Sequence, residues 1–179
     1  MVSPSTLTLP EYAPPEDKGF WTYWSDRFLS GHHTYITPRD PAVIDATTDA
    51  TTNTSSAYNT GLSVWDWVAQ HTTYTLSKDW KQPAQTITEG KADCEDVTFL
   101  IASMMLAAGY QDTDIAIGYL VYPDGTAELH TWNTIAQEPV DGTGTPGNID
   151  QYTYDTVATF TLSNTDDKGT TAQSDATAD

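Results

Sequence analysis

The clearest hydrophobic pattern in the chain predicts an amphipathic helix over residues 93–108. Apolar residues recur there at the three- and four-residue spacing of a buried helical stripe. The stripe consists of Val97, Leu100, Ile101, Met104, Met105 and Ala108. Gly109 follows directly and suits the left-handed conformation in which many helices end. We therefore expect this helix to lie in the core.

A shorter helix is predicted just before it, where Leu62, Trp65 and Val68 fall at helical spacing. Ser63 and Asp66 form a possible capping pair for this helix. The ordered domain is expected to begin near Gly61. Residues 45–60 contain mostly Thr, Asp, Asn, Ser and Ala, a composition typical of a surface loop or linker. Residues 74–83 are expected to be extended or irregular.

The second half of the domain has the pattern of an antiparallel sheet. Residues 115–122 and 128–135 are predicted strands joined by a hairpin turn at 123–126. A second tight turn at 136–137 leads into residues 138–143. Strict alternation then predicts a half-buried strand at Tyr152, Tyr154, Thr156, Ala158, Phe160 and Leu162. Helices followed by a meander indicate an α+β fold, with the long helix packed on an antiparallel sheet.

The chain is accordingly divided into three parts. Residues 1–60 are interpreted as an extended arm with an aromatic cluster and a Thr/Asp-rich linker, 61–163 as the folded domain, and 164–179 as a disordered acidic tail. The cluster comprises Phe20, Trp21, Tyr23, Trp24 and Phe28. It either packs on its own domain or provides a surface for a protein partner.

The charge balance excludes two classes of partner. Seven basic residues stand against 25 acidic ones, and the formal net charge is −18. Such a chain repels nucleic acid and anionic membranes, so neither is expected as a partner. The acidic residues are spread along the chain, which favours adaptation to high salt in a halophilic archaeon or its virus. The alternative is an ordinary solvated surface with acidic tails.

Other global features place the protein in solution. There is one cysteine, which excludes an internal disulfide, and no apolar run reaches the length of a membrane span. Residues 1–16 lack the basic and apolar regions of a secretory leader. We expect a soluble protein without a signal peptide, either cytoplasmic in a halophile or associated with a virion.

Cys94 is the first candidate for chemistry because it stands where an irregular segment becomes the long helix. A helix N-terminus favours thiolate, although Asp93, Glu95 and Asp96 oppose it. A buried, inert cysteine is the alternative. Since Val97 and Ile101 share its helix face, the thiol is expected to point into the fold.

His130 lies on the predicted strand 128–135, and Asp141 follows across the short turn. Antiparallel pairing about 136–137 would set Asp141 beside Trp132 and diagonal to His130. Asp150 and Asp155 remain alternative partners for the histidine. The other histidines, at positions 32, 33 and 71, show no comparable pattern.

Five motifs between residues 64 and 143 occur in the order found in one family. They are Val64–Val68 with Tyr74, Trp80–Pro83 with Ile87–Gly90, Asp93–Asp96 with its apolar helix, His130–Asn133 and Val140–Thr143. With them, about half of the chain resembles the transglutaminase-like superfamily of papain-like fold, particularly its small bacterial and viral cysteine peptidases. Ala92 departs from the pattern, because many relatives have glycine there.

The resemblance implies roles for three residues. Cys94 would be the nucleophile, His130 the base and Asp141 the residue that orients the imidazole. The backbone N–H of Cys94 would bind the oxyanion, with Gln82 or Gln85 as possible additional donors.

A metal is not required by this chemistry, but the resemblance makes calcium possible. Some relatives bind it through acidic residues that flank the nucleophile, which correspond to Asp93 and Glu95. Helix capping is the competing interpretation of these carboxylates.

Two functions follow from the sequence. The first is acyl transfer at an amide through a thioester, with hydrolysis of a peptide or isopeptide bond in a protein substrate favoured over cross-linking. The second is a non-catalytic structural or assembly protein, such as a virion or tail component of a haloarchaeal virus. In that case residues 1–30 would dock into the assembly.

Overall fold

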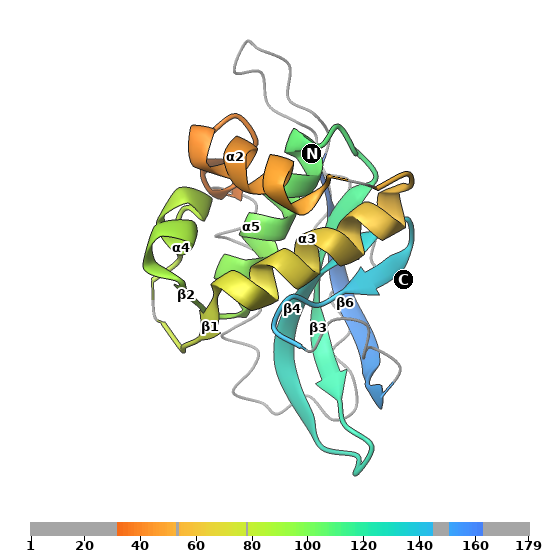
Figure 1. The fold of residues 1–179 in the computed structure, drawn as a ribbon. Helices are drawn as coiled ribbons and strands as arrows, with labels where there is room; N and C mark the ends of the chain where they lie inside the picture. The colour runs from red at the N-terminus through yellow and green to blue at the C-terminus, as the bar shows by residue number, and fades with distance from the viewer. Residues whose placement is uncertain (1–31, 53, 78, 145–150, 163–179) are drawn as a thin grey trace, which may run out of the picture.

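The fold was analysed in a computed structural model, which describes residues 32–52, 54–77, 79–144 and 151–162. Helices occupy one side of the molecule and an antiparallel sheet the other, as Figure 1 shows. The elements are η1 (His32–Tyr35), α2 (Pro41–Ala50), α3 (Ala57–His71), β1 (Thr73–Tyr74), α4 (Pro83–Glu89), β2 (Lys91–Ala92), α5 (Cys94–Ala107), β3 (Thr113–Val121), β4 (Ala127–Ile135), β5 (Glu138–Val140) and β6 (Thr153–Thr161). The predicted fold class is confirmed. No described helix is both long and apolar enough to cross a membrane.

The long helix α5 forms the centre of the core, as its stripe predicts. Asp93 caps its N-terminus in a capping box with Asp96, and Gly109 after its last turn has φ +90°. Ten consecutive residues of this helix, 96–105, are buried. One face packs with α2 and α3 around Val64, Trp65 and Val68, and the other packs on the sheet through Phe99.

The main sheet has the strand order β5-β4-β3-β6, with every neighbouring pair antiparallel. Strands β3 and β4 pair along their whole length, and the predicted boundaries are correct to within two residues. The tight turn at 136–137 is present, because both residues have positive φ. Strand β5 is shorter than the predicted 138–143 because only three of its residues pair with β4.

The prediction that residues 45–60 form a linker is wrong. Asp40 caps α2 through a hydrogen bond from the Ala42 N–H, and Val43 and Ala46 of this helix are buried in the core. Helix α3 begins at Ala57 with Ser56 as its cap, so the expected cap at Ser63 is also wrong. The folded core therefore begins well before Gly61. Composition is misleading here because small residues and Thr, which are common in loops, pack against α5 in this helix, as Thr47 does at the backbone oxygen of Met104.

The segment before the nucleophile helix contains more structure than predicted. At the two ends of 74–83, Tyr74 of β1 pairs in parallel with Ala92 of β2, and the short helix α4 begins at Pro83. Proline suits the first position of a helix, and Gly90 ends α4 with φ +60°. The extended arm with its aromatic cluster, the tail 164–179 and Asp150 lie outside the described residues.

Candidate active site

Cys94 is the first residue of α5, and His130 lies on β4, which packs beside this helix. Both side chains line one cavity of about 250 Å³. The other residues around it come from the β1 segment, the α5 N-terminus and β4: Tyr74, Leu76, Ser77, Asp93, Glu95, Glu128, Leu129 and Thr131. The thiol and the imidazole therefore lie at the same cavity.

His130 and Asp141 form a buried pair. The His130 Nε2 donates a hydrogen bond of 2.9 Å to Asp141 Oδ2, and the two residues are 6% and 2% exposed. The pairing of β4 with β5 places Val140 opposite Asn133, so the next residue, Asp141, comes level with Trp132 and diagonal to His130. Since Nε2 is occupied by Asp141, Nδ1 is the ring nitrogen left for the cavity.

Two further side chains hold Asp141. Thr143 donates from its hydroxyl and its backbone N–H to Asp141 Oδ1, over 2.7 and 3.1 Å. The hydroxyl of Tyr154, on β6, donates to Oδ2 over 3.2 Å. Burial alone would raise the pKa of Asp141, but His130 and Thr143 lower it below its usual value. The carboxylate therefore stays ionised next to the imidazole.

The roles of Thr143 and Tyr154 were not predicted from the sequence. Thr143 lies two residues after Asp141, a spacing at which a hydroxyl can reach back to a carboxylate. Its Oγ1 is also 3.3 Å from His130 Nε2. Tyr154 is separated from Asp141 along the chain and approaches it only through the sheet, where its ring packs edge-on against Trp132. The alternative partner Asp155 instead lies opposite Tyr119 on β3.

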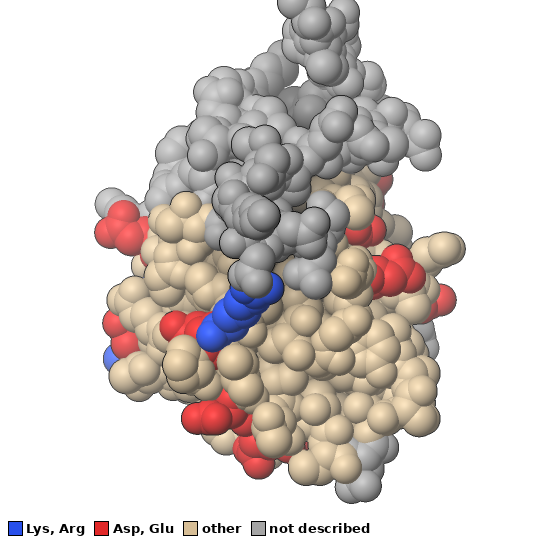
Figure 2. Space-filling view, turned by 90° about the horizontal axis from the view of Figure 1, so that it is seen from above, with Lys and Arg blue, Asp and Glu red and all other residues tan. Residues whose placement is uncertain are grey.

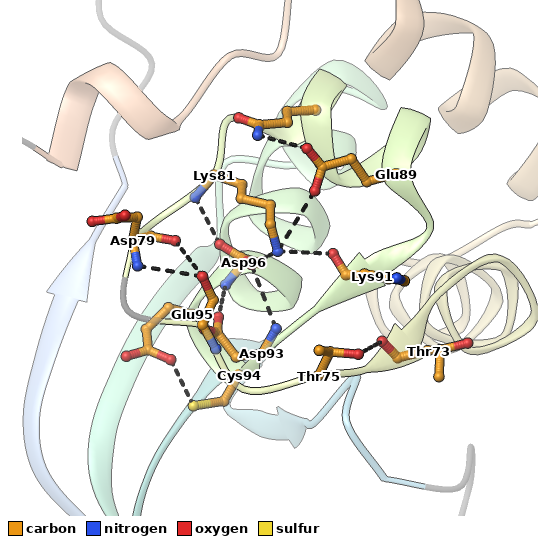
Figure 3. A network of polar contacts seen from close by, with 12 residues as sticks. Thr73, Thr75, Asp79, Lys81, Glu89, Lys91, Asp93, Cys94, Glu95 and Asp96 are labelled. Atoms are coloured by element: carbon orange, nitrogen blue, oxygen red, sulfur yellow. Dashed lines mark hydrogen bonds and ion pairs between the residues drawn. The ribbon is translucent and has the colours of Figure 1, made fainter.

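The thiol of Cys94 lies in an acidic environment, as Figure 3 shows. Its Sγ donates to Glu95 Oε2 over 2.9 Å. Burial, followed by the charge and hydrogen bond of Glu95 and the charge of Asp93, raises the pKa of Cys94 well above its ordinary value. The backbone N–H of Thr131 lowers the pKa of Cys94 and so opposes this effect. In this arrangement the thiol is protonated at neutral pH.

Asp93 serves mainly as a structural cap. Its Oδ1 accepts from the N–H of Asp96 and its Oδ2 from the N–H of Ser77, each over 3.2 Å. Burial, and then the charge of Glu95, raises the pKa of Asp93 to about 7. The competing interpretation of this residue as a helix cap is thus the one that the geometry supports.

The donor set does not fit a calcium ion in this arrangement. Asp93 accepts from backbone N–H groups, Glu95 from the thiol, and Asp96 from Lys81. Over the described ranges, no group of three or more His, Cys, Asp or Glu side chains is placed to hold a metal. The reaction derived below assigns no step to a metal.

Lys81 and Asp96 form an ion pair beside the N-terminus of the nucleophile helix α5. Lys81 Nζ lies 2.9 Å from Asp96 Oδ2, and the Lys81 backbone N–H donates to Oδ1 over 2.7 Å. Nζ also donates to the backbone oxygen of Lys91 (Figure 3). Asp96 is fully buried and Lys81 largely so. This pair fixes the segment before α4 against the first turn of α5.

The two glutamines proposed as oxyanion donors do not line the cavity. The Gln82 amide donates to the backbone oxygen of Thr34, and the Gln85 amide donates to Glu89 within α4. Both residues lie at the start of a helix that the sequence analysis missed. That helix turns their side chains toward other partners, so neither is retained as an oxyanion donor.

Comparison with known proteins agrees with this geometry. A model of the transglutaminase-like superfamily matches residues 44–141. Comparison with curated protein sequences finds no match. Among solved structures, a Cytophaga hutchinsonii protein described as a candidate cysteine protease is similar with a TM-score of 0.51 and 15% identity, over 70% of this chain and 43% of that one. The chain thus spans less than half of that protein.

LapG of Legionella pneumophila is also similar, with a TM-score of 0.46 and 16% identity over 83% of this chain and 77% of LapG. Its calcium-bound form gives a TM-score of 0.38 and 15% identity over 66% and 83%. At 15% identity, the Cytophaga hutchinsonii structure shows a shared fold only. The family model, by contrast, covers more than half of the sequence and includes Cys94, His130 and Asp141. The chain belongs to the transglutaminase-like superfamily.

Proposed function

We propose that this protein is a cysteine-dependent acyl-transfer enzyme that hydrolyses a peptide or isopeptide bond. The observation that carries the proposal is the buried His130–Asp141 pair at the cavity that also contains Cys94. Membership of the superfamily supports it. A thiol, an imidazole and a carboxylate that holds the imidazole are the parts that thioester chemistry needs.

In the proposed reaction, Nδ1 of His130 takes the proton of the Cys94 thiol. The thiolate then attacks the carbonyl carbon of the substrate and forms a carbon–sulfur bond. The carbon–nitrogen bond breaks as His130 returns the proton to the leaving amine. Water, deprotonated by His130, attacks the thioester, and the acid product leaves with the thiol restored.

The chain's own groups would support each step. Asp141 stays ionised and stabilises the imidazolium that forms when His130 takes the proton. The backbone N–H of Cys94, in the first turn of α5, would bind the oxyanion, because the first N–H groups of a helix have no partner within it. The backbone N–H of Thr131 favours the ionised form of the Cys94 sulfur, because it lowers the pKa of the thiol.

One observation favours a second function, that of a non-catalytic protein that retains the domain for assembly. Glu95 holds the thiol proton, and the surrounding carboxylates keep the thiol neutral. A catalytic site has to release this contact before His130 can act. If it is never released, the domain serves as a scaffold.

Alkylation of Cys94 distinguishes the two functions, because the chain has one cysteine. Iodoacetamide labelling is followed by mass spectrometry in the wild type, His130→Ala and the control His71→Ala, which alters an exposed histidine of α3. For an enzyme, the wild type and His71→Ala label alike and His130→Ala labels about tenfold more slowly or worse. Equal rates in all three, matching a free cysteine peptide, would support the scaffold and contradict the catalytic pair.

A further inference from the structure

We propose that the substrate is an extended polypeptide segment that pairs with the edge of β4 at Leu129. One of its apolar side chains would rest on Leu76 and Tyr74. This inference rests on the proposed function and specifies the substrate that the site accepts. It follows from the direction of the β4 backbone groups and from two exposed apolar side chains that line the same cavity.

The backbone N–H and C=O of Leu129 point away from β3, toward the edge of β4 that borders the cavity. In an antiparallel pair, alternate residues direct both their N–H and C=O groups away from the partner strand. Both residues of the turn at 136–137 have positive φ, which is the geometry of a two-residue hairpin loop whose flanking residue Ile135 bonds across to β5. Thr131 lies four positions before Ile135, so its N–H and C=O also point away from β3. Thr131 is therefore an outward residue. Leu129, two positions earlier and opposite Tyr119, has the same orientation.

Strand β5 does not cover this part of β4. It pairs only with Asn133–Ile135. Of these, Asn133 and Ile135 have the same outward orientation as Thr131. Among the described residues, no strand pairs with 127–131 on that side. The outward N–H and C=O of Leu129 are thus available to a visiting strand, which is how a sheet edge binds extended peptides.

The cavity also has an apolar surface. Tyr74, Leu76 and Ser77 line it together with Leu129 and His130. Leu76 is 80% exposed and Tyr74 53%, and they are two of only three large hydrophobic residues exposed in the described part of the chain. Exposed apolar groups that gather at one cavity indicate a binding surface. A substrate side chain placed there would cover both.

The distance along β4 from Leu129 to Thr131 connects the proposed peptide-binding surface to the reacting sulfur of Cys94. Leu129 lies two residues from Thr131, which is about 6–7 Å along a strand. Since Thr131 and Cys94 line the same cavity, a segment paired with Leu129 brings a neighbouring peptide group toward the sulfur of Cys94. Because both a main-chain N–H and a C=O are needed for this pairing, the fitting substrate is an unfolded segment or an exposed loop, not a single amino-acid amide.

The test uses the acetylated tripeptide Ala-Leu-Ala with a C-terminal chloromethyl ketone, which alkylates the cysteine as chloride leaves. Three analogues each carry one N-methylated amide, and iodoacetamide is the small reagent that cannot pair. Rates of Cys94 alkylation are measured by mass spectrometry. We expect at least one N-methylated analogue to react about tenfold more slowly than the parent, since it loses a hydrogen bond. Equal rates for all four peptides would overturn the proposal.

Leu76→Ser tests the apolar wall, with Ile44→Ser as a matched control for an exposed residue of α2 outside the cavity. Leu76→Ser is expected to slow the tripeptide reagent about threefold or more relative to iodoacetamide, by loss of apolar contact that only the tripeptide makes. Ile44→Ser should change neither rate.

The outcomes separate this inference from the function on which it rests. In one outcome, iodoacetamide labelling depends on His130 while the tripeptide rate responds to neither N-methylation nor Leu76→Ser. That result overturns the strand-pairing mode and leaves the proposed nucleophile in place. Failure of every reagent to label Cys94 faster than a free cysteine peptide contradicts the enzyme and this inference with it.

Discussion

Asp141 Oδ2 accepts a hydrogen bond of 2.9 Å from Nε2 of His130, and both side chains are buried. The two residues are 11 positions apart and meet because β4 and β5 fold back across the turn at 136–137. The same carboxylate is held by Thr143 and Tyr154, which fixes its orientation. The imidazole is thereby oriented before any substrate binds.

Asp141→Asn is expected to slow iodoacetamide labelling of Cys94 at pH 7.5 by about tenfold, because a neutral amide stabilises the imidazolium less well than a carboxylate. Asp155→Asn is the control, since the sequence left Asp155 open as the partner of His130 and the structure places it on β6. An unchanged rate in Asp141→Asn, or an equal loss in Asp155→Asn, would contradict the pairing.

Glu95→Gln is expected to make the thiol more reactive. The charge of Glu95 and its hydrogen bond both raise the pKa of Cys94, and the amide removes the charge. At pH 7.5 the labelling rate should rise about three- to tenfold as the thiolate fraction grows. Glu138→Gln changes a carboxylate on β5 outside the cavity and should leave the rate as it is. A slower rate in Glu95→Gln would mean that Glu95 assists deprotonation.

Asp93→Asn is expected to change how stability depends on pH. The pKa of Asp93 in the folded protein is about 7, above that of an unfolded chain, so the folded state binds this proton more tightly. The stabilisation is present at low pH and is lost as pH rises from about 4 to 7. Asparagine still caps the helix but does not titrate.

The wild type should therefore lose about 1–3 kcal/mol more than Asp93→Asn between these pH values, as measured by urea unfolding. Asp66→Asn, at an exposed carboxylate of α3, should follow the wild type. Parallel pH profiles for the wild type and Asp93→Asn would show that Asp93 is ionised throughout this range.

Lys81→Met is expected to destabilise the fold by about 3–5 kcal/mol, because it leaves Asp96 buried without its charge partner. The double variant Lys81→Met/Asp96→Asn should recover part of this loss, since the uncompensated charge is removed. Urea unfolding measures both variants. A loss below about 1 kcal/mol in the single variant would mean that the pair is solvated like a surface salt bridge.

Chloride salts are expected to stabilise the protein. The net charge is −18, and the face in Figure 2 shows acidic side chains at several separate places and few basic ones. Screening reduces this self-repulsion, so the melting temperature should rise by several degrees, roughly 5 °C, between 0.1 and 2 M KCl. Chloride is chosen because sulfate also strengthens apolar burial. A constant or falling melting temperature would oppose salt adaptation.

The pattern of apolar residues in the sequence predicted the helices and strands in which that pattern is strong. The stripe of α5, the apolar run and hairpin turn of β3 and β4, and the alternation of β6 were sufficient to place these elements to within about two residues. Helices α2 and α4 were missed, because Thr47 of α2 is buried at a helix contact and α4 has only seven residues. Short helices and buried threonines acquire their structure from what they pack against, which local composition does not report.

The sequence by itself determined the α+β class, the family resemblance and the types of residue available for chemistry. Only the tertiary structure decided which of these groups meet. It turned Gln82 and Gln85 away from the cavity, brought Tyr154 to Asp141 and placed Glu95 on the thiol. The physical reason is that hydrogen bonds act over about 3 Å. Chain positions far apart in sequence come within that distance only once strands pair and helices pack.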